Sequence, residues 1–363
     1  MYSNTVEGCL LSIALAYWPL NSFEAKQMSV SFSVALASLA IVIRPTAIIC
    51  WFYLGVCYAL FDIAFLSRRF WEVVCLQVIP IFFFSVSASI LIDSYFYNQW
   101  VFVLWNFFDF NVFKGLSSLY GTHPWYWYFA ECFPAILGIQ FPLFLLGSTD
   151  YRLKRLVGLI LFTLTVLSLN PHKELRFAFP LLPPSIVVSA FGIQRVIDWR
   201  LLKKQHIYFT LSIFGAFPAL YLSLIHQRAP IDTCFHLSTL SETKFVDILL
   251  PCHAIPFHGV IHNDNIERIT FLDCSPHLEA LQNKPFLNSS FLNTGKNETY
   301  MFQSDPFNFV LNRYLNRTNP DVIITSNLYV EEIKRATVGN NYSVCKILNH
   351  AQGDIGGKII ILC

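Results

Sequence analysis

The segment "NPHKELRFAFPLLPP", residues 170–184, places a dense charge cluster directly before an apolar sequence. His172, Lys173, Glu174 and Arg176 fall within five positions, and three prolines follow in the same segment. Charged side chains are costly inside a hydrocarbon layer, so the cluster predicts a boundary between membrane and water. Because proline lacks an N–H and restricts the residue before it, the prolines favour a sharp entry into the bilayer.

The composition of the whole chain supports a membrane location for the apolar sequence around this segment. Of 363 residues, 55% are hydrophobic and 13% are charged, whereas soluble domains carry about 25% charged residues. The net charge is only +2, no basic tract indicates a nucleic-acid partner, and no internal repeat is found. The sequence contains no glycine-rich phosphate loop, no HExxH and no EF-hand loop.

Apolar segments divide the chain into a membrane part and a more polar tail. We predict a mainly α, polytopic membrane domain over residues 1–225 with about eight transmembrane segments, followed by a second domain over residues 226–363. The eight apolar segments cover residues 8–20, 27–43, 47–66, 73–92, 133–147, 156–169, 178–197 and 207–225.

Two independent patterns predict the orientation of these segments. Four N-x-S/T sequons follow residue 226 and none precedes it, which indicates a lumenal tail; they are Asn288, Asn297, Asn316 and Asn341. With a lumenal tail and eight spans, the loops that contain Lys26 and the basic residues of 68–69, 152–155 and 200–204 are cytosolic. This agrees with the positive-inside rule, by which Lys and Arg are enriched in cytosolic loops. Both ends of the chain are lumenal in this interpretation.

The same topology brings three unusual stretches to the lumenal side. They are the turn at Arg44, the loop 93–132 and the charge cluster of 172–176. The loop mixes Trp, Tyr and Phe with polar residues, so we predict an interfacial segment of one or two short helices in the membrane plane. A groove for a lipid or a sugar and an ordinary aromatic belt both remain open for this loop.

The tail has the pattern of a small α/β lumenal domain. The runs "DVIITSNLYV" (321–330) and "KIIILC" (358–363) predict strands, and "PHLEALQ" (276–282) predicts a helix. Six cysteines are lumenal on this topology, where disulfides are expected; they are Cys132, Cys234, Cys252, Cys274, Cys345 and Cys363. We predict a Cys252–Cys274 bond, although spacing alone does not fix the pairing.

A stretch of the tail is rich in cysteine and histidine, the residue types that bind zinc. Cys252, His253, His258 and His262 follow no standard zinc spacing, so no metal is predicted there.

Several motifs together resemble glycosyltransferase family 22, the GT-C mannosyltransferases of the endoplasmic reticulum. "NPHKELRFAFPLLPP" resembles their His-Lys-Glu-x-Arg-Phe motif, and "DSYFYNQWVFVLWNFFDFNV" and "YGTHPWYWYFAECFPAILG" resemble two successive lumenal stretches of the family. "SNTVEGCLLSIALAYWP" is similar to the opening of an early family helix. The tail, with "LLPCHAIPFHGVIH" and "FLDCSPHL", resembles members that add the third mannose of the GPI core.

The resemblance implies a GT-C-like fold and α-1,2 mannosyl transfer from dolichyl-phosphate mannose to a dimannosyl GPI precursor. It implies an enzyme of the endoplasmic reticulum membrane that contacts membrane lipids, works without a nucleotide sugar and needs no cofactor. On this basis His172, Lys173, Glu174 and Arg176 are candidates for binding the donor phosphate, with a simple anchoring turn as the alternative. Possible substrate contacts are Arg44, Asp93, His123 and Trp125.

The chain departs from the family at its catalytic motif. An Asp-Glu pair in the first lumenal loop carries catalysis in the family, and this sequence contains no Asp-Glu dipeptide. Glu7 and Asp93 are the acidic residues near early lumenal ends, and neither matches that motif. The catalytic residue is therefore unassigned, and we expect that family N-terminal spans are missing and that this chain alone is inactive. A noncatalytic subunit and a lipid transporter or scramblase are the alternatives.

Overall fold

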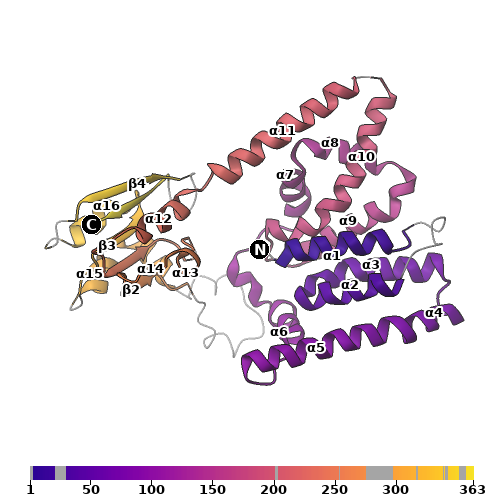
Figure 1. Cartoon of the computed structure of the whole chain (residues 1–363), viewed down its shortest axis with the longest axis horizontal. Helices are drawn as coiled ribbons and strands as arrows, with labels where there is room; N and C mark the ends of the chain where they lie inside the picture. The colour runs from indigo at the N-terminus through magenta and orange to yellow at the C-terminus, as the bar shows by residue number, and fades with distance from the viewer. Residues whose placement is uncertain are drawn as a thin grey trace. The chain divides into compact units, whose positions relative to one another are not determined.

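The computed structural model describes residues 3–20, 30–200, 203–252, 254–274, 297–315, 318–337, 339, 342–350 and 357–363. The chain forms two compact units, Met1–Gly215 and Ala216–Cys363, and the architecture is mainly helical with one small sheet (Figure 1). Each unit is described by itself below.

Helices of the first unit overlap all eight apolar segments that the sequence predicts. The α-helices are α1 Ser3–Tyr17, α2 Val30–Ile43, α3 Ile48–Cys57, α4 Arg68–Val73, α5 Ile79–Tyr97, α6 Val103–Phe108, α7 Phe133–Leu137, α8 Phe141–Ser148, α9 Lys154–Leu169, α10 Leu182–Asp198 and α11 Lys204–Leu224. The last of these, α11, begins in the first unit and ends in the second. Short 3₁₀ and π turns extend several of them, among them the 3₁₀ turn η9, Leu175–Leu181.

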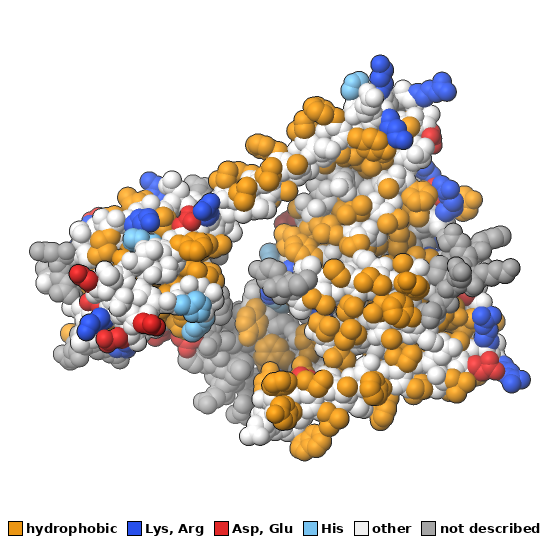
Figure 2. Space-filling model, viewed as in Figure 1, with side chains coloured by type: hydrophobic (Ala, Val, Ile, Leu, Met, Phe, Trp, Pro, Cys, Tyr) orange, Lys and Arg blue, Asp and Glu red, His pale blue; other side chains and the backbone are white. Residues whose placement is uncertain are grey.

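Among the described residues, five helical segments are long and apolar enough to cross a membrane. They are Pro45–Asp62, Arg68–Tyr97, Tyr128–Ser148, Leu175–Asp198 and Lys204–Ser238. The most apolar window of Arg68–Tyr97 has no buried residue, so its Phe and Leu side chains face outwards. Orange apolar side chains cover much of the first unit in Figure 2, as a surface in contact with lipid requires. The multi-pass membrane prediction is therefore supported.

The 93–132 stretch begins later than the sequence predicts. Helix α5 continues to Tyr97, where Asn98 adopts a left-handed conformation with φ of 53° and ends it. Asp93 therefore lies inside α5, and its assignment to the loop was wrong because the helical run outlasts the apolar run. The stretch contains the short helix α6 and the π turn Asp109–Phe113 that continues it, and their location in the membrane plane stays a prediction.

Helices α8 and α10 of the first unit pack at close range. A Cβ added at Gly147 would lie 1.9 Å from the Val188 carbonyl oxygen, and one added at Gly192 would lie 2.0 Å from that of Leu143. The two backbones therefore touch where these glycines face the partner helix. Leu159, a fully buried residue of α9, belongs to the apolar core beside them.

The second unit is a small α/β domain with a five-stranded sheet in the order β2-β1-β3-β5-β4. Strands β2, β1 and β3 are parallel, and β5 is antiparallel to both β3 and β4. Its elements are α12 Ala229–Ser238, β1 Phe245–Leu249, α13 Phe257–Val260, β2 Arg268–Phe271, α14 Glu298–Ser304, α15 Pro306–Tyr314, β3 Val322–Ser326, α16 Val330–Ala336, β4 Val344–Asn349 and β5 Lys358–Leu362.

Alternation along the strands gives this sheet two apolar faces. Val246 and Ile248 join a core with α12, whereas Leu249 and Ile323 join a second core with α14, α15 and α16. The predicted strand 358–363 is confirmed as β5, whereas only 322–326 of the predicted strand 321–330 forms β3, because a turn follows and α16 begins at Val330. The predicted helix 276–282 lies outside the described residues.

Two disulfides fasten the second unit. Cys252 is bonded to Cys274, as predicted. A second bond joins Cys345 of β4 to Cys363, just after β5. Cys132 and Cys234, the other two cysteines that we assigned to the lumen, are buried free thiols.

Candidate active site

The predicted charge cluster lies in the first unit, in the connection between α9 and α10. His172, Lys173 and Glu174 occupy the loop after α9, and Arg176 lies in the 3₁₀ turn η9. Helix α1 packs against η9, so that a Cβ at Gly8 would lie 3.4 Å from the backbone of Pro180. The apolar end of the 170–184 segment is thus packed in the core of the first unit, and its charged start lies at the edge of that core.

Lys173 is the buried member of the cluster, with 3% of its surface exposed. Its ammonium donates to the carbonyl oxygen of Asn170 at 2.7 Å and to that of His123 at 3.0 Å. Burial lowers the pKa of this ammonium. Because two backbone carbonyls already hold it, Lys173 joins the charge cluster to the aromatic stretch around residue 123 and is the less suitable of the two predicted phosphate-binding cations.

His172 is held between two acceptors. Its Nδ1 lies 2.9 Å from the carbonyl oxygen of Gly121, and its Nε2 lies 3.0 Å from Oε1 of Glu174. Both hydrogen bonds form together only when both ring nitrogens carry a proton, because each partner accepts. The ring therefore orients Glu174 and leaves neither nitrogen free for a phosphate in this arrangement.

Glu174 pairs with Arg176 as well as with His172. Nη2 of Arg176 donates to Oε1 of Glu174 at 2.8 Å, and Nε of Arg176 also contacts the carboxylate. Burial raises the pKa of Glu174, but the hydrogen bonds and charges of Arg176 and His172 outweigh it and lower the pKa overall. The Arg176 side chain remains 44% exposed, so it keeps donors for a further anion.

Arg44 brings a second guanidinium to the cluster from the turn after α2. Its Nε lies 3.3 Å from Oε2 of Glu7 in α1, and its Nη1 donates to Oγ of Ser3 at 3.1 Å. Burial lowers the pKa of Arg44, Glu7 opposes that effect, and the positive charge of Arg176 adds to it. A nearby anion would relieve the repulsion between the two arginines.

The ring of Phe177 lies close to both guanidiniums. Cζ of Arg44 is 5.0 Å from the ring centroid and Cζ of Arg176 is 6.0 Å from it. The cluster carries an excess of positive charge. Its three fixed cations are Arg44, Lys173 and Arg176, and its two carboxyl groups are those of Glu7 and Glu174. His172 adds a further positive charge in the doubly protonated form that its two hydrogen bonds require. The cluster can therefore receive a singly charged anion such as a phosphodiester.

Other predicted site residues are less closely tied to this cluster. His123 joins it through its backbone, since its N–H donates to the Pro171 carbonyl at 3.1 Å, and its ring stacks on Trp127 at 4.4 Å. Trp125 is 72% exposed and contacts Tyr126. Asp93 accepts a hydrogen bond from Ser89 of its own helix. Within the described ranges, neither Trp125 nor Asp93 makes a hydrogen bond, ion pair or ring contact with the cluster.

Sequence reasoning missed two partners that the fold supplies. Glu7 was noted and left without a role, yet it is buried beside Arg44. Tyr128 is fully buried and donates its hydroxyl to the Glu174 carbonyl at 3.3 Å. A lone acidic residue opening an apolar helix was the available signal for Glu7, whereas nothing in the pattern distinguished Tyr128 from the aromatic residues around it.

The sequons fall in the second unit. Asn297 is the N-cap of α14, where its side chain accepts a hydrogen bond from the Tyr300 N–H at 2.8 Å. Asn288, Asn316 and Asn341 lie outside the described residues.

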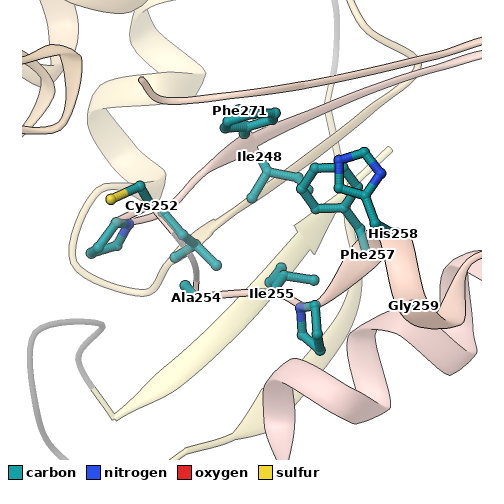
Figure 3. Close-up of a pocket in the computed structure, with 11 residues that line it drawn as sticks. Ile248, Cys252, Ala254, Ile255, Phe257, His258, Gly259 and Phe271 are labelled. Carbon is teal, nitrogen blue, oxygen red and sulfur yellow. The ribbon is translucent and has the colours of Figure 1, made fainter. Parts of the chain in front are cut away.

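The cysteine–histidine stretch lines an apolar cavity of about 530 Å³ in the second unit (Figure 3). Cys252 is used in a disulfide, and the His258 ring lies against Phe257 with centroids 4.1 Å apart. No group of three or more potential metal ligands occurs in the part of the chain that the structure describes.

Comparisons with known proteins give a consistent picture. The model of the Alg9-like mannosyltransferase family matches residues 1–262. GPI alpha-1,2-mannosyltransferase 3 of Bos taurus is 33% identical over 96% of this chain and 62% of its own length. The Homo sapiens protein of the same name is 32% identical over 99% of this chain and 63% of its own length.

A fungal relative extends this similarity. GPI mannosyltransferase 3 of Yarrowia lipolytica is 31% identical over 86% of this chain and 58% of its own length. The chain thus spans less than two thirds of the length of these curated relatives. No solved structure matches it significantly.

Proposed function

This chain belongs to the Alg9-like mannosyltransferase family, and from that membership we propose that it acts in GPI-anchor biosynthesis. The proposed reaction moves mannose from dolichyl-phosphate mannose to a dimannosyl GPI precursor and forms an α-1,2 bond to the third mannose. The names of the similar bovine and human proteins support this assignment. A family of transferases does not favour a transporter or a noncatalytic subunit.

The observation that carries the proposal is the arrangement of Arg44 and Arg176 around Phe177. A dolichyl phosphate ester of mannose carries one negative charge, which the excess positive charge of the cluster attracts. Guanidinium groups bind such oxygens with directed pairs of hydrogen bonds. We assign Arg176, with its exposed side chain, as the principal phosphate contact and Arg44 as the second.

The chemistry divides into leaving-group binding and proton removal. The acceptor hydroxyl attacks C1 of mannose, the bond from C1 to the phosphate oxygen breaks, and dolichyl phosphate leaves with the electron pair. The hydroxyl proton passes to a base. Arg176 and His172 lower the pKa of Glu174, which makes its carboxylate a weak base. The cluster is therefore assigned to the leaving phosphate and not to the proton, and the proposal includes no metal or cofactor.

The proposed topology has eight spans in the endoplasmic reticulum membrane with a lumenal C-terminal domain. The 172–176 cluster contacts Gly121 and His123, and Arg44 lies over the ring of Phe177 directly after the cluster. These contacts support the location of all three stretches on one side of the membrane. In Figure 2 many Lys and Arg side chains of the first unit gather along the right and upper right margins, beside the apolar surface. That distribution supports the positive-inside interpretation.

Complementation tests the proposed activity. The protein that carries this sequence is expressed in cells that lack their own GPI alpha-1,2-mannosyltransferase 3, and GPI-anchored proteins are counted at the cell surface. We expect surface display to return. Normal expression without any return of surface display contradicts the proposal.

A further inference from the structure

Helix α1 begins with a buried polar face that the proposed reaction does not use. Asn4 is 1% exposed and Glu7, one turn further along the helix, is 5% exposed. A carboxylate is rarely buried unless a partner compensates its charge. The partner of Glu7 therefore indicates what the buried carboxylate does.

The start of α1 is fixed by its contact with the turn η9. A Cβ added at Gly8 would lie 3.4 Å from the Pro180 backbone, so the two elements pack closely. Arg176 and Phe177 belong to the same turn. Glu7, the residue before Gly8, is thus held near the phosphate-binding cluster with little freedom to move.

Arg44 meets this end of α1 through two of its three guanidinium nitrogens. Nη1 donates to Oγ of Ser3 at 3.1 Å, and Nε lies 3.3 Å from Oε2 of Glu7. The contact with Glu7 lacks the alignment of a hydrogen bond, so it acts through charge. The third nitrogen, Nη2, makes no hydrogen bond to a described residue, and 17% of the side chain is exposed. The guanidinium is thus held through two nitrogens and can donate from the third.

Glu7 also compensates the charge of Arg44. The guanidiniums of Arg44 and Arg176 lie 5.0 and 6.0 Å from the centroid of the Phe177 ring, so two like charges approach the same side chain. Glu174 is paired with Arg176, whereas the carboxylate that contacts Arg44 is that of Glu7. Without Glu7, a partly buried cation would face a second cation, and its long side chain would turn towards water.

From these contacts we propose that Glu7 is a positioning residue of the donor-phosphate site. It holds the Arg44 guanidinium beside Phe177 and Arg176, with Ser3 as a neutral partner, and it does not itself touch the donor. This role rests on the proposed function, because it requires that Arg44 binds the phosphate of a lipid-linked donor.

Charge balance alone would give Glu7 the opposite effect. A carboxylate near a cationic site weakens the binding of an anion, so its removal would then strengthen donor binding. Positioning predicts instead that removal weakens donor binding, because Arg44 leaves its place. The sign of the change separates the two interpretations.

Binding of a soluble donor analogue measures this sign and needs no transfer. Purified full chain in detergent is titrated with citronellyl-phosphate mannose, a phosphodiester with a short isoprenoid chain, in a calorimeter. Glu7→Gln removes the charge and keeps the size of the side chain. We expect it to weaken binding about five- to tenfold, as the loss of one charged contact would. Glu7→Asp, which keeps the charge on a shorter side chain, should recover part of the loss.

Two further variants show whether Glu7 acts through Arg44. Arg44→Ala should weaken binding by itself, and Glu7→Gln should add nothing to that loss in the double variant. Ser3→Ala removes the neutral contact and should weaken binding about twofold, again only while Arg44 is present, which tests the positioning even if Glu7→Gln fails to fold. The matched control is Glu72→Gln, which should leave binding unchanged, because Glu72 also pairs with an arginine but lies outside the cluster.

Three results would overturn the positioning role. They are binding by the Glu7→Gln variant that equals or exceeds that of the parent chain, an equal loss from Glu7→Gln with and without Arg44, and no binding by the parent chain. The expected binding pattern in a protein that fails the complementation described above would contradict the proposed transfer and still support the role of Glu7. The two proposals can therefore fail separately.

Discussion

At the scale of single residues, Arg176 is the exposed cation of the 172–176 cluster, and its removal tests the phosphate contact. We expect Arg176→Ala to lower kcat/KM for dolichyl-phosphate mannose about 10- to 100-fold, because one or two charge-assisted hydrogen bonds are lost. Arg176→Lys should recover part of this loss, since it restores the charge without the forked donors. Initial rates at varied donor concentration measure the effect.

The control for Arg176 is Arg68→Ala. Arg68 is also paired with a glutamate, Glu72, and its side chain is 94% exposed and lies outside the cluster. Donor kinetics that stay at the parent level in Arg176→Ala would remove Arg176 from the site.

Lys173 gives a stability prediction. We expect Lys173→Met to lower the thermal midpoint of the detergent-solubilised protein by a few degrees, because the buried ammonium loses its two hydrogen bonds to the Asn170 and His123 carbonyls, at about 1 kcal/mol each. The exposed Lys154 supplies the matched control, Lys154→Met. Equal midpoints for the two variants would show that the buried ammonium does not hold this loop.

The residue types of the cluster could be predicted from sequence, but their partners could not. The density of charge in 172–176 singles out this segment in any apolar chain. The pairing of Glu7 with Arg44 joins the start of α1 to the end of α2, and no spacing rule encodes such a contact. Likewise, the backbone carbonyls that hold Lys173 carry no sequence signal.

At the scale of elements, the crossing of α8 and α10 depends on two glycines. We expect Gly192→Ala to reduce the yield of folded protein sharply, because its Cβ would lie 2.0 Å from the Leu143 carbonyl oxygen. Size-exclusion chromatography of a fluorescent fusion measures the yield.

Gly55→Ala is the matched control for the helix crossing. Gly55 lies in α3 with no atom within 4 Å of the added Cβ, so alanine should be neutral or stabilise by up to about 1 kcal/mol. Folded yields that do not differ between the two variants would contradict the close packing of α8 on α10.

Apolar length predicts these elements well, and their ends less well. All eight apolar segments overlap helices because long apolar runs leave few alternatives in a membrane. The end of α5 was misplaced because Asp93 reads as a polar boundary, whereas its carboxylate is satisfied by Ser89 one turn earlier in the helix. In the second unit, β1 and β2 become strands through pairing with β3 and with each other.

At the scale of the whole molecule, the proposed topology predicts glycosylation of the tail. We expect protein from microsomes to shift on gels after enzymatic removal of N-glycans, and the shift to shrink with Asn297→Gln. Thr299→Ala should have the same effect while keeping the Asn297 cap. A lumenal second unit would be contradicted by the absence of glycosylation at every sequon. It would also be contradicted if protease added to the cytosolic side of intact microsomes digested the glycosylated second unit.

The central claim is mannosyl transfer from the lipid-linked donor, and one measurement tests it most directly. Microsomes from cells without their own enzyme, expressing the protein that carries this sequence, are given labelled dolichyl-phosphate mannose and a dimannosyl GPI acceptor. We predict a labelled trimannosyl product from which α-1,2-mannosidase releases the label. The yield of this product should be much lower with Arg176→Ala. Protein expressed at normal levels that forms no such product, or an equal yield from Arg176→Ala, would contradict the account.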